Sequence, residues 1–206
     1  MDQMEVNNAL SLCGTVSESP AYSHSSRGLD FYSFPLTVER LSGNSDTLNI
    51  LVRRDQLDDT AIGPGTRLTV EGEVRSFNNR RANGARLVIT VLATKLLSGG
   101  DADQNEVTLL GTLCKPPNLR TTPMGREICD LMLAVNRHYG RSDYLPCICW
   151  GVNARKAAAW DTGTRLRIKG RLQSRDYIKL TEEGAVKRTA FEISAAEVSR
   201  FASLES

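Results

Sequence analysis

Cationic side chains occupy every second position of the segment 165–171, and the pattern continues to residue 179 with two interruptions, at Gln173 and Tyr177. Side chains alternate across a β-strand, so the apolar even positions are expected to face a core and the odd positions to face solvent. The odd positions are Arg165, Arg167, Lys169, Arg171, Gln173, Arg175, Tyr177 and Lys179. Such a face offers a polyanion a track of positive charge and one flat ring on which a base can stack. The alternative is an ordinary solvated basic face.

Three further aromatic residues have a spacing that suits stacking. Tyr144 and Trp150 are six residues apart, so one strand would place both on the same face. Tyr139 follows the next strand upstream, in a loop that could close over a bound strand. The alternative for Tyr144 and Trp150 is packing in a core. Trp160, on an expected helix, is interpreted as a core residue.

Residues that could support catalysis or metal binding are poorly placed for it. Asp143, Asp161 and Asp176 could be imagined as the metal-binding carboxylates of a nuclease, but all three fall at expected turns or strand ends. Cys147 and Cys149 could be imagined as metal ligands, but the sequence has no Cys-x-x-Cys pair. Reduced, buried cysteines are therefore the preferred interpretation. We therefore expect no enzyme activity, no metal and no cofactor.

The sequence contains an internal repeat that spans both halves of the chain. At an offset of 97 residues the same residue recurs at nine positions, and the offset then becomes 98 for a further group that includes Gly65–Leu68 and Gly163–Leu166. The nine are Gly14, Pro20, Gly28, Leu36, Val38, Arg40, Ser45, Asp46 and Leu48. A repeat of this length is a whole domain, and two copies in 206 residues give domains of ordinary size.

The two copies differ in charge. Residues 1–105 carry a net charge of −3 and residues 106–206 a net charge of +5. The N-terminal equivalent of the basic face is Arg67, Thr69, Glu71, Glu73, Arg75 and Phe77, in which two cations meet two acids. Thr47 and Arg53 replace the rings of Tyr144 and Trp150. We expect the N-terminal copy to bind a polyanion weakly through this face, if at all.

The order of elements predicts an all-β fold. The C-terminal copy has apolar alternation over 107–113, 128–135, 144–150, 165–177 and from 190 onward, with a helix over 153–160. Gly170 interrupts the fourth strand and suggests a bulge. The N-terminal copy repeats this order. Five strands with one helix between the third and fourth favour a Greek-key barrel of the oligonucleotide-binding (OB) type over a β-sandwich, which needs about seven strands.

The predicted organisation is therefore two tandem OB barrels. Residues 1–98 form an N-terminal OB domain that is degenerate in DNA-binding residues, 99–105 a polar linker, 106–200 a C-terminal OB domain and 201–206 a short tail. The first residues show no secretory signal, and no apolar run is long enough to cross a membrane. We expect a cytoplasmic protein.

The C-terminal copy resembles the bacterial single-stranded DNA-binding protein family. The stretches that carry the resemblance are 111–113 with Pro117, 120–125, 133–137, Ser142–Trp150 and 169–177. The Gly-Arg-Leu-Gln-Ser-Arg run that starts at Gly170 is the most specific. The N-terminal copy is similar to the family only in its scaffold positions.

The resemblance implies a bacterial, nucleoid-associated protein and specific roles for its residues. The family's stacking aromatics fall at Tyr139, Tyr144, Trp150 and Tyr177. Its phosphate contacts would fall at Arg120, Arg126, Arg137, Arg171 and Arg175. The family works with four OB domains, so a chain with two would form a homodimer. The chain ends without the family's acidic, Pro-Phe-tipped tail, so recruitment of replication or repair proteins through such a tail is not expected.

Two functions remain open from the sequence. The leading one is binding of single-stranded DNA without strong sequence preference, in replication, recombination or repair, mainly through the C-terminal OB domain. The alternative is an accessory protein-interaction module of replication restart with weak DNA binding, suggested by the acidic, ring-poor N-terminal copy.

Overall fold

The computed structural model describes residues 6–57, 61–78, 87–137, 140–182 and 184–201. Its contacts divide the chain into two compact units. The N-terminal unit comprises Asn8–Arg75 and Ile89–Val107, and the C-terminal unit comprises Met1–Asn7, Ser76–Val88 and Thr108–Ser206. Ser76 thus belongs to the C-terminal unit although it lies in the N-terminal sequence copy. The domain boundaries expected from the sequence remain a prediction.

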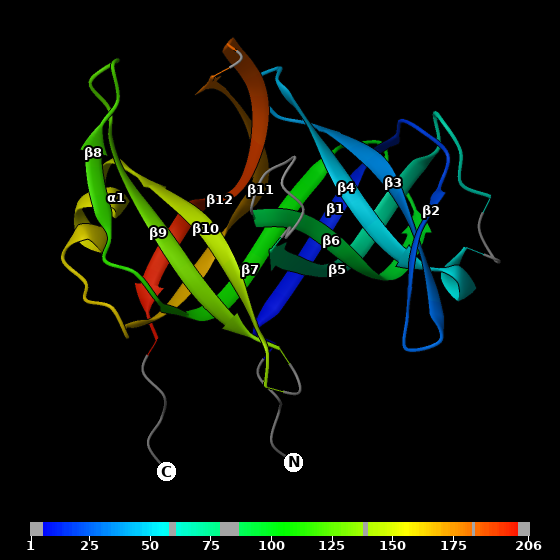
Figure 1. Ribbon diagram of the computed structural model, residues 1–206, viewed down its shortest axis with the longest axis horizontal. Coiled ribbons are helices and arrows are strands. Elements are labelled where there is room, and N and C mark those ends of the chain that lie inside the picture. The colour runs from blue at the N-terminus through cyan, green and yellow to red at the C-terminus, as the bar shows by residue number, and fades with distance from the viewer. Residues whose placement is uncertain (1–5, 58–60, 79–86, 138–139, 183, 202–206) are drawn as a thin grey trace. The chain divides into compact units, whose positions relative to one another are not determined.

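Strands make up most of the described chain (Figure 1). In the N-terminal copy these are β1 (Asn8–Val16), β2 (Ala21–Ser26), β3 (Leu29–Glu39), β4 (Ser45–Arg53), β5 (Arg67–Asn78) and β6 (Leu87–Ser98), with a 3-10 turn, η1 (Arg54–Gln56). In the C-terminal copy they are β7 (Gln104–Leu113), β8 (Asn118–Thr121), β9 (Glu127–Asn136), β10 (Ser142–Trp150), β11 (Arg165–Thr181) and β12 (Gly184–Arg200), with one helix, α1 (Gly151–Ala158).

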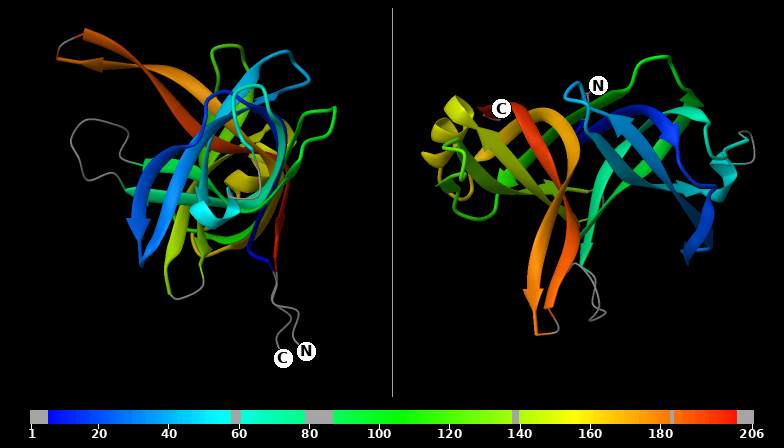
Figure 2. Two further views of the ribbon diagram at one scale, coloured as in Figure 1. Left: turned by 90° about the vertical axis from the view of Figure 1, so that its right-hand side faces the viewer. Right: turned by 90° about the horizontal axis from the view of Figure 1, so that it is seen from above.

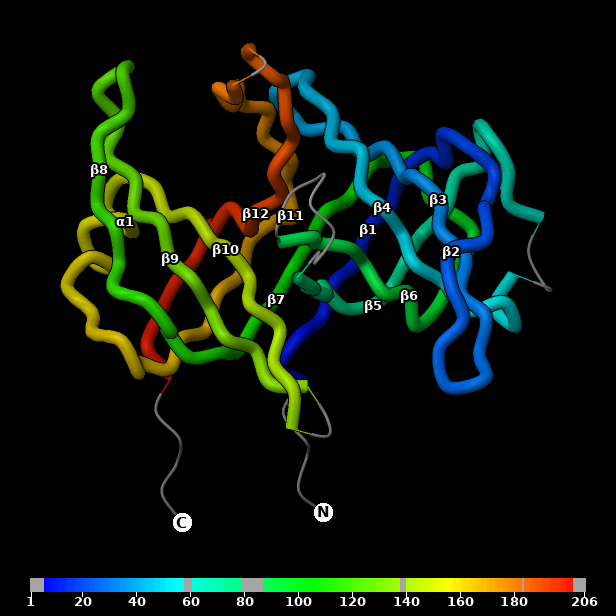
Figure 3. The backbone as a smooth tube through the Cα atoms, viewed as in Figure 1, coloured from blue at the N-terminus to red at the C-terminus, as the bar shows by residue number. Residues whose placement is uncertain are grey.

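Each copy closes into a five-stranded barrel, which confirms the predicted fold class. In the C-terminal copy the strand order is β7-β11-β12-β10-β9, and pairing of β9 with β7 closes the ring. In the N-terminal copy the order β1-β5-β6-β4-β3 closes in the same way through β3 and β1. The third and fifth barrel strands pair in parallel in both copies, as at Cys147 and Ile193. The tube of Figure 3 follows this path in each copy.

Repeated glycines mark the places where barrel strands approach most closely. A Cβ on Gly111 would lie 2.7 Å from the carbonyl oxygen of Ala134, where β7 meets β9, and Gly14 has the corresponding place between β1 and β3. A Cβ on Gly170 would clash with the carbonyl oxygen of Ser194 on β12. The β11–β12 register also shifts between Lys169 and Gly170, which confirms the predicted bulge.

One strand in each copy was not expected from the sequence. β2 and β8 each pair with the edge of the following strand, outside the closed ring. Every residue of both strands is exposed, so neither has the apolar alternation by which a strand is recognised. The expected helix over 153–160 also begins and ends two residues earlier, and Trp160 lies beyond its end. Trp160 is 7% exposed, which confirms its placement in the core.

The cores are built from the alternating apolar residues of the strands. In the C-terminal unit Leu109, Leu113, Leu133, Leu145 and Leu166 are each no more than 1% exposed. The structure has no helix among its described residues with the length and apolar character of a membrane span.

Cysteine reactivity should report on this core. Burial raises the pKa of Cys147 well above its ordinary value and that of Cys149 to about 12, so both thiols are neutral at pH 8. We expect native protein to react slowly with a disulfide reagent at pH 8, with half-buried Cys114 first, and denatured protein to titrate all five cysteines. Rapid reaction of Cys147 or Cys149 in the native protein would contradict their burial.

Candidate nucleic-acid interface

Trp150 lies at the end of β10 with its ring partly open to solvent. The residue is 39% exposed, and its indole Nε1 donates a hydrogen bond to Ser194 Oγ at 3.3 Å. That bond fixes one edge of the ring and holds it in one orientation. Tyr144, on the same strand, is 49% exposed. Neither ring is in the core, so both are available for stacking.

A cavity of about 670 Å³ opens beside Trp150. Its lining consists of Thr121, Gly125, Arg126, Glu127, Trp150, Gly151 and Arg155. Arg155 is ion-paired with Glu127, whereas Arg126 is exposed and its backbone N–H donates to Thr122 Oγ1 at 3.1 Å. The cavity therefore combines one aromatic face with cationic side chains, which suits a base and its phosphate.

The basic face of β11 is only partly as the sequence predicted. Arg165, Arg167, Lys169, Arg171, Arg175 and Lys179 are all exposed. Gln173, however, was expected to face solvent and is 6% exposed, donating a hydrogen bond from Nε2 to Glu192 Oε1 at 3.0 Å. The expectation for Gln173 was wrong because the register after the bulge pairs it with Glu192, which is itself 8% exposed and accepts this hydrogen bond.

Acidic and aromatic partners also modify this face. The guanidinium groups of Arg165 and Arg167 lie 5.1 and 5.2 Å from the ring centre of Phe201. Lys169 Nζ is 3.9 Å from a Glu197 carboxylate oxygen, a distance at which an exposed pair contributes little. These cations of β11 therefore have an acidic neighbour on β12, Glu197, and an aromatic neighbour just beyond its end, Phe201.

The outer half of the β11–β12 hairpin carries the third ring. The two strands remain paired up to Thr181 and Gly184, and Figure 2 shows this hairpin extending beyond its barrel. Tyr177 is partly exposed, and the Arg175 guanidinium lies 5.8 Å from its ring centre. Arg175 Nε is also 3.6 Å from Glu192 Oε2.

Arg188 is a candidate that the sequence analysis missed. It pairs in register with Tyr177, and its buried Nε has no hydrogen-bond partner in the described part of the chain. Cross-strand register is the signal that could have revealed it, because strands joined by a tight hairpin place opposite residues on one face.

Two other predicted cations are held by acids. Arg120 Nε donates to Asp130 Oδ2 at 2.6 Å, and this hydrogen bond raises the pKa of Arg120. Both side chains are about two-fifths exposed, so Arg120 can still turn toward a phosphate. Arg137 Nε donates to Asp143 Oδ2 at 2.8 Å, and its Nη2 donates to the carbonyl oxygen of Ser76 at 2.8 Å. Tyr139 lies outside the described residues.

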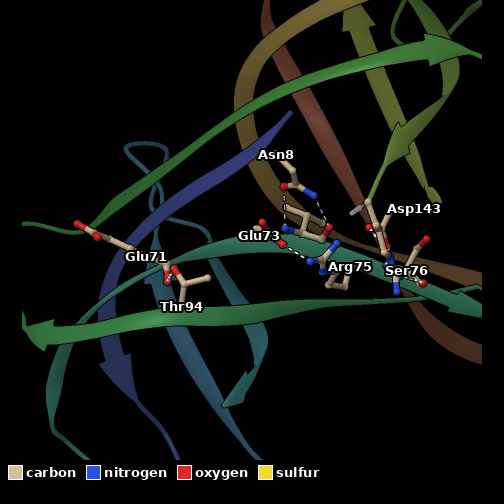
Figure 4. Close-up of polar contacts among 9 residues, drawn as sticks. Asn8, Glu71, Glu73, Arg75, Ser76, Thr94 and Asp143 are labelled. Atoms are coloured by element: carbon tan, nitrogen blue, oxygen red, sulfur yellow. Dashed lines mark hydrogen bonds and ion pairs between the residues drawn. The ribbon is translucent and has the colours of Figure 1, made fainter. Parts of the chain in front are cut away.

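Asp143 has a structural environment rather than a catalytic one. Its side chain is fully buried, paired with Arg137, and accepts a hydrogen bond from the Ser76 backbone N–H at 2.6 Å (Figure 4). Asp176 accepts from Thr189 Oγ1 and Lys187 Nζ, and the Lys187 contact lowers the pKa of Asp176. Among the residues that the structure describes, no group of three or more His, Cys, Asp or Glu is placed to hold a metal ion.

The corresponding face of the N-terminal copy uses its cations internally. Arg67 forms an ion pair with Asp103 and donates to the carbonyl oxygen of Gly100 at 2.9 Å, which anchors the segment before β7. The hydrogen bond to Asp103 raises the pKa of Arg67. Arg75 is ion-paired with Glu73 (Figure 4). This face lacks the run of exposed cations found on β11, although it ends in one exposed ring, Phe77.

Known proteins resemble the chain at two levels. Residues 104–201 match the family described as the single-strand binding protein family. Single-stranded DNA-binding protein B of Bacillus subtilis is 35% identical over 80 residues, which cover 35% of this chain and 71% of that protein. A Listeria innocua single-stranded DNA-binding protein 2 is 36% identical over 80 residues. That match covers 35% of this chain and only 50% of the Listeria protein.

The whole chain also has a structural counterpart. The wild-type single-stranded DNA binding protein from Thermus aquaticus superposes with a TM-score of 0.79 at 22% identity, covering 97% of this chain and 95% of that one. That similarity supports the fold of both copies. The sequence match of the C-terminal copy, which carries the exposed rings and cations, supports the family, and the chain belongs to the single-strand binding protein family.

Proposed function

We propose that the chain binds single-stranded DNA without strong sequence preference, mainly through its C-terminal unit. The observation that carries the proposal is the partly open ring of Trp150, fixed by Ser194 beside a cavity that Arg126 also lines. Bases stack on such a ring whatever their identity, because every base has a π-face. Tyr144 and Tyr177 would add further stacking positions, and Tyr139 is retained as a sequence-based candidate.

Phosphate contacts would come from the exposed cations around these rings. On β11 these are Arg165, Arg167, Lys169, Arg171, Arg175 and Lys179, and elsewhere they are Arg120 and Arg126, together with half-buried Arg137. Arg137 donates a hydrogen bond to Asp143, so we assign it a positioning role as well as a phosphate contact. Electrostatic binding of this kind weakens steeply with added salt.

The test compares labelled oligothymidylate with a duplex of equal length, by fluorescence anisotropy at low and moderate salt. Preferential, salt-sensitive binding of the single strand is the expected result. Equal affinity for the duplex would refute the proposal. A stable protein partner, together with DNA affinity no better than micromolar, would instead favour the interaction module.

The salt dependence should separate the two copies. Arg171→Ala is expected to reduce the slope of log affinity against log salt by about 0.7, the value for one phosphate contact to a single strand. Arg67→Ala should leave the slope unchanged, because Arg67 is bonded to Asp103 and Gly100. Equal changes of slope in the two variants would contradict the assignment of binding to β11.

We also propose that the chain works as a homodimer in replication, recombination or repair, since two chains would supply four OB barrels. Light scattering tests the first part directly. A mass of one chain at working concentration would contradict it.

A further inference from the structure

A row of side chains crosses β2, β3 and β4 in the N-terminal unit. His24 pairs in register with Phe31, and Phe31 pairs with Arg53. Register partners lie on the same face of a sheet, so the three side chains form one line across the strands. Figure 1 labels the three strands.

The C-terminal copy has the same row with its chemistry reversed. There Arg120 on β8 pairs with Ile128 on β9, and Ile128 pairs with Trp150 on β10. In this C-terminal row the cation, Arg120, is on β8 and the ring, Trp150, is on β10. In the N-terminal row the outer ring, His24, is on β2 and the cation, Arg53, is on β4. Arg53 on β4 replaces the ring of Trp150 on β10, but the N-terminal row still has an exposed ring, His24, on β2.

The rings of the N-terminal row are already stacked. His24 and Phe31 have centroids 5.0 Å apart and planes 9° from parallel. His24 is exposed and Phe31 is partly exposed, while Ser23 Oγ lies 3.0 Å from His24 Nδ1. The arrangement holds the imidazole flat against a supporting ring, and a nucleobase stacking on the imidazole would lengthen the stack by one ring.

Aromatic pairs across a hairpin also stabilise the hairpin itself. Tyr22 and Tyr32 form such a pair in the neighbouring register, at 5.8 Å and 85°, an edge-on contact. Tyr32 pairs with buried Val52, so this second pair belongs to the core-facing side of β3. What distinguishes the His24–Phe31 pair is its place on the outer side, next to an arginine.

Arg53 provides the complementary charge. Its side chain is 45% exposed and lies in an exposed ion pair with Asp55, 2.7 Å between Nη2 and Oδ2. Arg53 Nε also donates to Asp55 Oδ1 at 3.1 Å, so the pair is bidentate, but both partners are exposed and a phosphate can compete with Asp55 for the guanidinium. The next outer pairs along β3 and β4 are uncharged as far as Glu39, namely Ser33 with Leu51, Pro35 with Asn49 and Thr37 with Thr47.

From this row we infer a second nucleobase-stacking site for single-stranded DNA, formed by His24, Phe31 and Arg53 in the N-terminal unit. The inference rests on the proposed DNA binding and adds a site on a different face from the β5 equivalent of the basic strand. Stacking supplies most of the affinity of this second site for DNA, because the site has one cation whereas β11 has several.

Histidine NMR tests the site directly. The chain has two histidines, so the imidazole Cε1–H region holds two signals, and His24→Gln identifies the signal of His24. Oligothymidylate long enough to span both units is added to the full chain while Trp fluorescence is recorded in parallel. Ring-current displacement of the His24 signal, saturating with the DNA, is expected.

Affinity measurements with variants complete the test. His24→Ala together with Phe31→Ala should weaken binding of the long oligonucleotide at least about fivefold, the lower end for one stacked base. Tyr22→Ala is the matched control, because it removes a ring from the same hairpin on the other side, and it should leave the affinity unchanged. Far-UV circular dichroism checks that all the variants are folded.

The outcomes separate the two proposals. Trp quenching with an unmoved His24 signal, or a moved signal with unchanged affinity in the double variant, overturns the second site and leaves the proposed function intact. Absence of both quenching and displacement overturns the proposed function itself. Displacement of His24 without Trp quenching supports the second site and overturns the leading role of the C-terminal unit.

Discussion

Trp150→Ala is expected to weaken binding of oligothymidylate by about 1–3 kcal/mol while the barrel remains folded. Trp150 is 39% exposed, and its indole Nε1 donates a 3.3 Å hydrogen bond to Ser194 Oγ. Removing the indole therefore leaves the core leucines in place. Tyr177→Ala, at a partly exposed position on the hairpin, should cost a similar amount. Anisotropy titrations at fixed salt measure both.

The control for the ring variants is Leu180→Ala. Leu180 is 82% exposed and lies on β11 three residues beyond Tyr177, where it pairs with Ala185. Removing it shortens an exposed apolar side chain on the same hairpin without removing a ring. Unchanged affinity in both ring variants, or an equal loss in Leu180→Ala, would mean that stacking on these rings does not hold the DNA.

Asp143→Asn is expected to lower the free energy of unfolding by about 3 kcal/mol. Asp143 is fully buried and accepts hydrogen bonds from Arg137 and from the Ser76 N–H. The amide cannot accept as many bonds and leaves the Arg137 charge unbalanced in a half-buried position. Urea denaturation monitored by circular dichroism gives the value.

The repeat supplies matched comparisons for this prediction. Asp46 is equally buried, and Arg40 Nε donates to it at 2.7 Å, so Asp46→Asn should be destabilising as well. Asp176→Asn, at an exposed position, should have little effect. A fully stable Asp143→Asn protein would contradict the structural role. Metal-dependent DNA cleavage by the wild type that disappears in this variant would show an enzyme instead.

Local sequence patterns account for most of the fold. Apolar alternation placed the five barrel strands, and Gly170 correctly marked the bulge in β11. β2 and β8 escaped detection because hairpin strands outside the ring bury no apolar face. For the same reason the stack of His24 on Phe31 could not be foreseen, since it depends on the register of a strand that alternation does not reveal.

Partners of the charged residues were less predictable. The rings and cations themselves can be read from the segments around Tyr144, Trp150 and β11. The contacts of Arg165 and Arg167 with Phe201 join residues more than thirty positions apart. The burial of Gln173 against Glu192 depends on the change of register after the bulge. Such contacts require the closed barrel and cannot be obtained from one strand.

The most direct test of the central claim uses Trp150 as its own reporter. The chain has two tryptophans, and Trp160→Phe leaves Trp150 as the single emitter. Titrating this variant with oligothymidylate should quench its fluorescence strongly at low salt, and added salt should reverse the quenching as the DNA dissociates. Saturated DNA binding, verified by anisotropy, with no change in Trp150 emission would contradict stacking at this ring and with it the proposed mode of binding.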